Sequence, residues 1–136
     1  MDWACGVIAA PRQSSESIHL CHESLIRNGL RPLVFAEPGT QVPETADTIC
    51  RPWTIAERLP YIVPAESGKF GNCQNYLQCA ADLLGEYRKA EVILIVEDDA
   101  VLCNGAVQFV DGLCWPHEEC GAISLYAANS SSVRAG

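Results

Sequence analysis

Residues 92–99, VILIVEDD, constrain the fold more than any other stretch, because five uninterrupted apolar residues run straight into three carboxylates. An apolar run without alternation is typical of a strand buried on both faces, in a parallel sheet flanked by helices. Glu97, Asp98 and Asp99 then lie at the carboxyl end of the strand, where such sheets bind ligands. Because crowded carboxylates repel one another, we expect a bound divalent cation to neutralise them. The alternative is that they cap the following turn or lie in solvent.

The first 40 residues follow a strand–helix–strand pattern. Residues 3–10, WACGVIAA, predict a central parallel strand that Pro11 ends. Ser14 or Ser15 then caps a helix that ends at Asn28 and Gly29, and residues 31–36 form a second strand. The inward positions of that helix are Ile18, Cys21 and Leu25. A right-handed crossover places the turn at residues 37–39 at the same edge as Pro11 and Arg12.

Periodicity is lost over residues 41–71, where four prolines recur, although a short strand fits residues 48–51. This segment is either a loop over the ligand edge or a plain surface crossing. A helix that opens at Gly71 and Asn72 follows and leads into the acidic strand. Its expected inward face consists of Cys73, Tyr76, Leu77, Ala80, Leu84 and Tyr87.

After the acidic strand, Asn104 is the expected cap of a further helix, and residues 121–128 predict a last strand. The inward positions of that helix are Ala106, Val107, Val110, Leu113 and Cys114. Strands that alternate with helices indicate a three-layer α/β/α, Rossmann-like fold with a mainly parallel sheet. We expect one domain over residues 1–128 and a flexible tail over residues 129–136.

Charge and hydropathy exclude several classes of partner. The net charge of −8 and the pI of about 4.7 argue against nucleic acid or an anionic membrane surface as a partner. No apolar stretch approaches the roughly 20 residues of a membrane span, and the N-terminus does not resemble a signal peptide. We therefore expect a cytoplasmic protein, in which the eight cysteines are mostly small buried hydrophobes or free thiols.

Three smaller signals bear on ligand binding. Arg12, at the end of the first strand, suits a ribose or phosphate contact, and a surface ion pair suits it equally. Lys69 lies in a glycine-containing turn before a helix, which favours phosphate, although the same glycine and asparagine also serve simply to start the helix. His19, Cys21, His22 and Glu23 lie close together, but this spacing is more typical of a solvated helix face than of a metal site.

The segment ILIVEDDAVL resembles the acidic motif of GT-A fold glycosyltransferases, especially the Glu-Asp-Asp form of N-acetylglucosaminyltransferases. The resemblance extends to VIAAPR, VFAEPG, GKFGNCQNYLQCAADLL and AISLY. It implies that Asp99 ligates the metal directly, Mn²⁺ or Mg²⁺, while Glu97 and Asp98 support it. It also implies that Pro11 and Arg12 lie near the nucleotide and that Glu37 lies near the base.

The implied function is binding of a nucleotide-diphosphate sugar and transfer of the sugar to an acceptor hydroxyl. The sequence names no catalytic base. The chain ends about 37 residues after Asp99, whereas family members continue much further and supply the acceptor half there. We therefore carry an alternative, a non-catalytic, truncated GT-A-like module that acts as a homo-oligomer or a partner-binding protein.

The same ten residues also resemble the opening strand of response-regulator receiver domains, which bind magnesium through adjacent acids. Such domains require a phosphoacceptor aspartate at the end of a later strand and then a lysine. Neither follows Asp111 in this chain, so this alternative ranks third.

Overall fold

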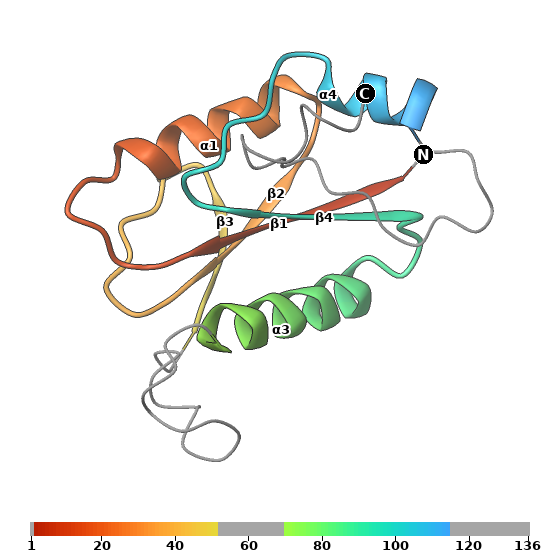
Figure 1. The fold of residues 1–136 in the computed structure, drawn as a ribbon. Helices are drawn as coiled ribbons and strands as arrows, with labels where there is room; N and C mark the ends of the chain where they lie inside the picture. The colour runs from red at the N-terminus through yellow and green to blue at the C-terminus, as the bar shows by residue number, and fades with distance from the viewer. Residues whose placement is uncertain (1, 52–69, 115–136) are drawn as a thin grey trace, which may run out of the picture. The chain divides into compact units, whose positions relative to one another are not determined.

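The computed structural model describes residues 2–51 and 70–114. The chain divides into two compact units, Met1–Asn104 and Gly105–Gly136. The first unit contains a four-stranded sheet with helices α1 and α3, and the second contains the short helix α4 (Figure 1). The expected boundary between the domain and its tail, at residue 128, lies outside the described residues.

The sheet is parallel throughout and has the strand order β3-β2-β1-β4. Its strands are β1 (Trp3–Ala9), β2 (Pro32–Ala36), β3 (Asp47–Cys50) and β4 (Val92–Glu97). Within the first unit, α1 (Glu16–Arg27) and α3 (Phe70–Glu86) lie on opposite faces of this sheet (Figure 1). The predicted α/β fold with a mainly parallel sheet is therefore confirmed, and β1 is a central strand as expected.

The first strand–helix unit follows the local sequence closely. Ile18, Cys21 and Leu25 are all buried, as the helical spacing predicts. Gly29 has a φ of 79°, and the Leu30 N–H donates to the Leu25 carbonyl at 3.1 Å, which ends α1 with the expected left-handed stop. Near the start of α1, the Ser14 hydroxyl accepts a hydrogen bond from the Glu16 N–H at 3.2 Å.

The predicted inward face of α3 is wrong. Tyr76, Leu77, Leu84 and Tyr87 are exposed, Ala80 is half-buried, and the residues that turn inward are Asn75, Cys79 and Leu83. The reason is that Cys79 and Leu83, which lie on another face of the same helix, pack against Gly6 of β1. A Cβ at Gly6 would lie only 2.7 Å from Cys79 Sγ, so α3 approaches the sheet where β1 carries no side chain. The side chain of Cys73 lies outside the described part of the structure.

The core on the α3 side of the sheet is a single apolar cluster. Its fully packed members are Ala4, Leu33, Phe35, Cys79 and Leu83, with Ala90, Ile93 and Ile95 packed against them. Five described cysteines are free thiols, and burial raises the pKa of Cys5, Cys21 and Cys79 to about 12. Cys50 and Cys103 are exposed free thiols, so all five described cysteines fit the expectation of buried hydrophobes or free thiols, and three of them are buried.

The acidic strand differs from its prediction in one respect. Within the described sheet, β4 has a single neighbour, β1, and its residues 93–96 are only half-buried. The expected strand over residues 121–128 lies outside the described ranges. Burial of the acidic strand on both faces is therefore wrong for the described sheet.

The second unit begins with α4 (Ala106–Phe109), which continues as one π-helical turn, Val110–Cys114. Its capping residue is Gly105, at a φ of 80°, so the predicted cap at Asn104 is wrong by one residue. Val107 and Val110 are buried as expected. Among residues 2–51 and 70–114, no helix is long and apolar enough to cross a membrane.

Candidate functional site

The candidate site lies at the carboxyl edge of the sheet, between β1 and β4. The chain passes from β1 to β2 on one side, whereas β4 joins β1 on the other side. This reversal of strand order is the point at which open α/β sheets bind their ligands. Arg12 follows β1, Glu37 follows β2 and Asp98 follows β4, so three neighbouring strands each deliver a charged residue to one edge.

Main-chain hydrogen bonds extend this convergence past the ends of the strands. The Glu37 N–H donates to the Ala9 carbonyl at 3.0 Å, and the Asp98 N–H donates to the Ile8 carbonyl at 3.1 Å. Both neighbours are thereby joined to the last residues of β1. The main chain at Glu37 and Asp98 is therefore held in place by the register of the strands.

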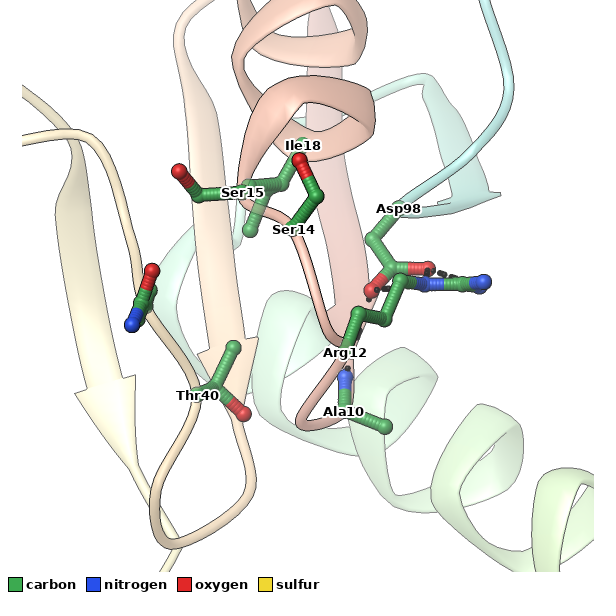
Figure 2. A pocket seen from close by; sticks show the side chains of 8 residues that line it. Ala10, Arg12, Ser14, Ser15, Ile18, Thr40 and Asp98 are labelled. Atoms are coloured by element: carbon green, nitrogen blue, oxygen red, sulfur yellow. Dashed lines mark hydrogen bonds and ion pairs between the residues drawn. The ribbon is translucent and has the colours of Figure 1, made fainter.

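Asp98 and Arg12 form the central contact of the site (Figure 2). Arg12 Nε donates to both carboxylate oxygens at 3.0 Å, and Arg12 Nη2 donates to Oδ1 at 2.6 Å. The Ala10 N–H also points to Oδ2, at 3.4 Å. The Asp98 side chain is 4% exposed and that of Arg12 is 43% exposed. The hydrogen bond and the charge of Asp98 raise the pKa of Arg12.

The other two acids of the motif point elsewhere. The Asp99 side chain is 52% exposed, and its Oδ2 lies 3.5 Å from Arg12 Nη2. Glu97 is exposed, and its carbonyl accepts a hydrogen bond from the Ala100 N–H that closes the turn. The three consecutive carboxylates therefore occupy different environments. Arg12 already offsets part of the repulsion for which the sequence led us to expect a metal ion.

The donor set fits a divalent ion that arrives with a ligand. Among the described residues, no group of three or more His, Cys, Asp or Glu side chains is arranged to hold a metal. Asp99 and Glu97 remain as two exposed carboxylates. Magnesium is commonly held by one or two carboxylates, with its other ligands supplied by substrate phosphates and water. Exposed carboxylates of this kind could supply that share of the ligands, while the described residues form no complete protein cage.

A small pocket lies beside the ion pair, with a volume of about 10 Å³. It is lined by Ala10, Arg12, Ser14, Ser15, Ile18, Thr40, Gln41 and Asp98 (Figure 2). This space holds about one water molecule, and the buried Thr40 hydroxyl has no hydrogen-bond partner among the described residues. A nucleotide does not fit inside the pocket, so a ligand of that size would have to lie across the edge.

Glu37 lies at this edge as predicted. It is half-buried, and its pKa is raised, first by burial and then by the charge of Asp98. Pro11 is exposed nearby, and a Cβ at Gly39 would lie 3.8 Å from Pro11 Cγ, which confirms the expected proximity of the two turns. Lys69 and the loop expected over the ligand edge lie outside the described residues.

Two buried residues bind the segment after the acidic turn: Ser24 of α1, and Asn28, which caps the C-terminus of α1. Sequence patterns assign no role to Ser24 and mark Asn28 only as the end of the helix. Ser24 Oγ accepts a hydrogen bond from the Leu102 N–H at 3.0 Å and donates to the Cys21 carbonyl at 2.7 Å. Asn28 Nδ2 donates to the Cys103 carbonyl at 3.1 Å. Serine and asparagine near the end of a helix usually indicate local capping, so nothing in the sequence signals this long-range role.

A second ion pair joins Arg51, the residue after β3, to Asp82 of α3. Arg51 Nη1 lies 2.6 Å from Asp82 Oδ2, and the Arg51 guanidinium stacks 4.8 Å from the centre of the Phe35 ring. Gln78 donates to the other Asp82 oxygen at 3.1 Å. The sequence offered no signal for this pair, because Arg51 and Asp82 belong to elements far apart in the chain.

The predicted solvated face of α1 is only partly correct. His19 and Glu23 are exposed, but His22 is buried, and burial is the main cause that lowers its pKa. Cys21, which was predicted to face inward, does turn toward the acidic strand, where its thiol donates to the Glu97 carbonyl at 3.6 Å. These four side chains do not converge on one point.

The geometry thus brings six of the predicted site residues to one edge: Pro11, Arg12, Glu37, Glu97, Asp98 and Asp99. Comparison of the chain with protein-family models, with curated proteins and with solved structures finds no match.

Proposed function

We propose that this chain binds a nucleotide-diphosphate sugar at the carboxyl edge between β1 and β4, together with a divalent metal, Mn²⁺ or Mg²⁺. The observation that carries the proposal is the meeting of Arg12, Asp98 and Asp99 at the point where the strand order reverses. The resemblance of residues 93–102 to GT-A glycosyltransferases supports the class of ligand.

Electrostatics favour a ligand that brings its own cation. Glu37, Glu97, Asp98 and Asp99 outnumber Arg12 at this edge, so a bare diphosphate would meet net negative charge. A divalent metal held by Asp99, with Glu97 in support, supplies the missing positive charge and neutralises the leaving nucleotide. Arg12 is fixed by Asp98 and presents its exposed side toward the same edge, where it suits a phosphate or ribose oxygen.

The reaction class that we attach to the site is glycosyl transfer to an acceptor hydroxyl. The described residues assign no catalytic base, so the proposal for this chain rests on ligand binding. A cytoplasmic location belongs to the same proposal.

Calorimetric titration with UDP and with GDP, each with and without Mn²⁺, tests the binding. We expect saturable binding of one nucleotide that requires the metal and weakens at least tenfold in Asp99→Asn, about 1.4 kcal/mol. Glu86→Gln is the matched control, because Glu86 is an exposed carboxylate at the end of α3. Absence of metal-dependent binding, or equal affinity in Asp99→Asn and the wild type, contradicts the proposal.

A second candidate function is that of a non-catalytic module that self-associates. The observation in its favour is an exposed apolar stripe, formed by Tyr76, Leu77 and Leu84 of α3 and by Tyr87, which follows the helix. Exposed apolar patches of this kind commonly mark protein contacts. Sedimentation velocity of the wild type and of Leu77→Glu tests it: a wild-type dimer that the variant disrupts supports self-association, and a monomeric wild type contradicts it.

A further inference from the structure

Arg12 occupies the position at which a cation would meet the buried acid of the motif. Its Nε and Nη2 atoms contact both oxygens of Asp98, within 3.0 Å (Figure 2). The Ala10 N–H donates a further hydrogen bond to Asp98 Oδ2, and the Asp98 side chain is almost fully buried. Asp98 is therefore a satisfied carboxylate that has no free oxygen to offer a metal.

The same guanidinium also affects the exposed acid. Arg12 Nη2 lies 3.5 Å from Asp99 Oδ2, close enough for its charge to oppose a second cation at Asp99. For a metal to gain Asp98 as a ligand, the ion pair would have to break and leave a buried charge uncompensated. For a metal to bind at Asp99 alone, it would have to overcome the repulsion of Arg12.

We propose that Arg12 is an internal counter-cation that prevents divalent metal from binding to the acidic turn in the absence of a phosphorylated ligand. The inference takes the identity of the metal from the proposed function. It adds to that function an order of binding, in which the metal binds only when the phosphorylated ligand is present. A diphosphate would supply oxygen ligands for the metal and negative charge near Arg12, and this charge would offset the repulsion between the two cations.

One nitrogen of the Arg12 guanidinium is available to a phosphate, so that binding of the phosphorylated ligand and binding of the metal can be coupled. Its Nη1 has no hydrogen-bond or ion-pair partner among the residues that the structure describes, and 43% of the side chain is exposed. Arg12 can thus contact a phosphate oxygen without releasing Asp98. Because binding linkage is reciprocal, the nucleotide raises the affinity for metal by the same factor by which metal raises the affinity for nucleotide.

Titration with Mn²⁺ alone, followed by the electron paramagnetic resonance signal of the free ion, tests the inference without any nucleotide. We expect no saturable Mn²⁺ binding to the wild type over the titrated range. Arg12→Gln, in which the acids lose their counter-cation, should bind Mn²⁺ saturably and at least about tenfold more tightly than the wild-type limit. The double variant Arg12→Gln, Asp98→Asn has the same net charge as the wild type and should lose this gain. Equal affinity of the wild type and Arg12→Gln overturns the inference.

A measurement on the wild type keeps the test independent of how well Arg12→Gln folds. In protein labelled with ¹⁵N-arginine, we expect the Nε–H signal of Arg12, assigned by its absence in Arg12→Lys, to stay unchanged when Mg²⁺ alone is added. A saturable shift with Mg²⁺ alone overturns the inference. A failure of the proposed function would show separately, as absent nucleotide binding in the presence of metal.

Discussion

Gly6 of β1 lies directly against Cys79 of α3. A Cβ built at Gly6 would come within 2.7 Å of Cys79 Sγ and within 2.9 Å of Leu83 Cδ1. Both neighbours are fully buried, so neither has space into which it can retreat. This contact sets how closely α3 packs on the sheet, and it selects the face that the helix buries.

Replacement of Gly6 by alanine should therefore destabilise the fold by about 1–3 kcal/mol, through overpacking of a filled core. Gly85→Ala is the matched control, because nothing lies within 4 Å of a Cβ at that exposed position of α3. The control should be neutral or gain up to about 1 kcal/mol from helix propensity. Urea unfolding measures both, and equal stabilities for the two variants would contradict the packing described.

The bond between Ser24 and Leu102 predicts a local effect near the acidic turn. Ser24→Ala removes the acceptor of the Leu102 N–H and should cost about 1–3 kcal/mol. Amide hydrogen exchange at Leu102 should become faster than in the wild type. Ser17→Ala, a change on the same helix at a half-buried position, should alter stability by less than about 0.5 kcal/mol. Unchanged exchange at Leu102 in Ser24→Ala would show that this bond does not hold the segment.

Burial predicts which thiols react. Cys5, Cys21 and Cys79 have pKa values raised to about 12, first of all by burial, so they carry almost no thiolate at pH 8. Cys50 and Cys103 are exposed. Brief alkylation of the folded protein, mapped by mass spectrometry, should label these two residues and spare the buried three. Rapid labelling of Cys79 would be inconsistent with the packing of α3.

Because the imidazole of His22 is buried, the free energy of unfolding should decrease at acidic pH. Because burial lowers the pKa of His22 in the fold, the unfolded chain takes up a proton first as the pH falls. The contribution of neutral His22 is complete above the unfolded pKa of about 6.5 and is lost progressively as the pH falls below it. Urea unfolding at pH 7.5 and pH 5.5 should show a smaller decrease for His22→Gln than for the wild type. Equal decreases would argue against this role.

The elements set by local chemistry were predictable from the sequence. The strand that Pro11 ends, the helix that Gly29 ends and the acid-terminated strand are each recognisable within a few residues of chain. The convergence of Arg12, Glu37 and Asp98 was predictable as well, because right-handed crossovers bring the ends of parallel strands to one edge.

The features that the sequence did not predict correctly depend on tertiary packing. The helix α3 carries apolar residues on two faces, and only the close approach to Gly6 decides that the face with Cys79 and Leu83 turns inward. Three adjacent carboxylates look equivalent in sequence, yet strand register turns Asp98 inward onto Arg12 and leaves Asp99 in solvent. Ser24 binds Leu102 across 78 positions of sequence, which no local pattern records.

Paramagnetic broadening by Mn²⁺ in the presence of UDP locates the bound ion on the assigned amide spectrum. We expect broadening centred on residues 97–101 and extending to Ala10 and Arg12, and we expect it to require UDP and to disappear in Asp99→Asn. Broadening centred elsewhere, or none at saturating UDP and Mn²⁺, would contradict the assignment of this edge as a site for metal and nucleotide diphosphate.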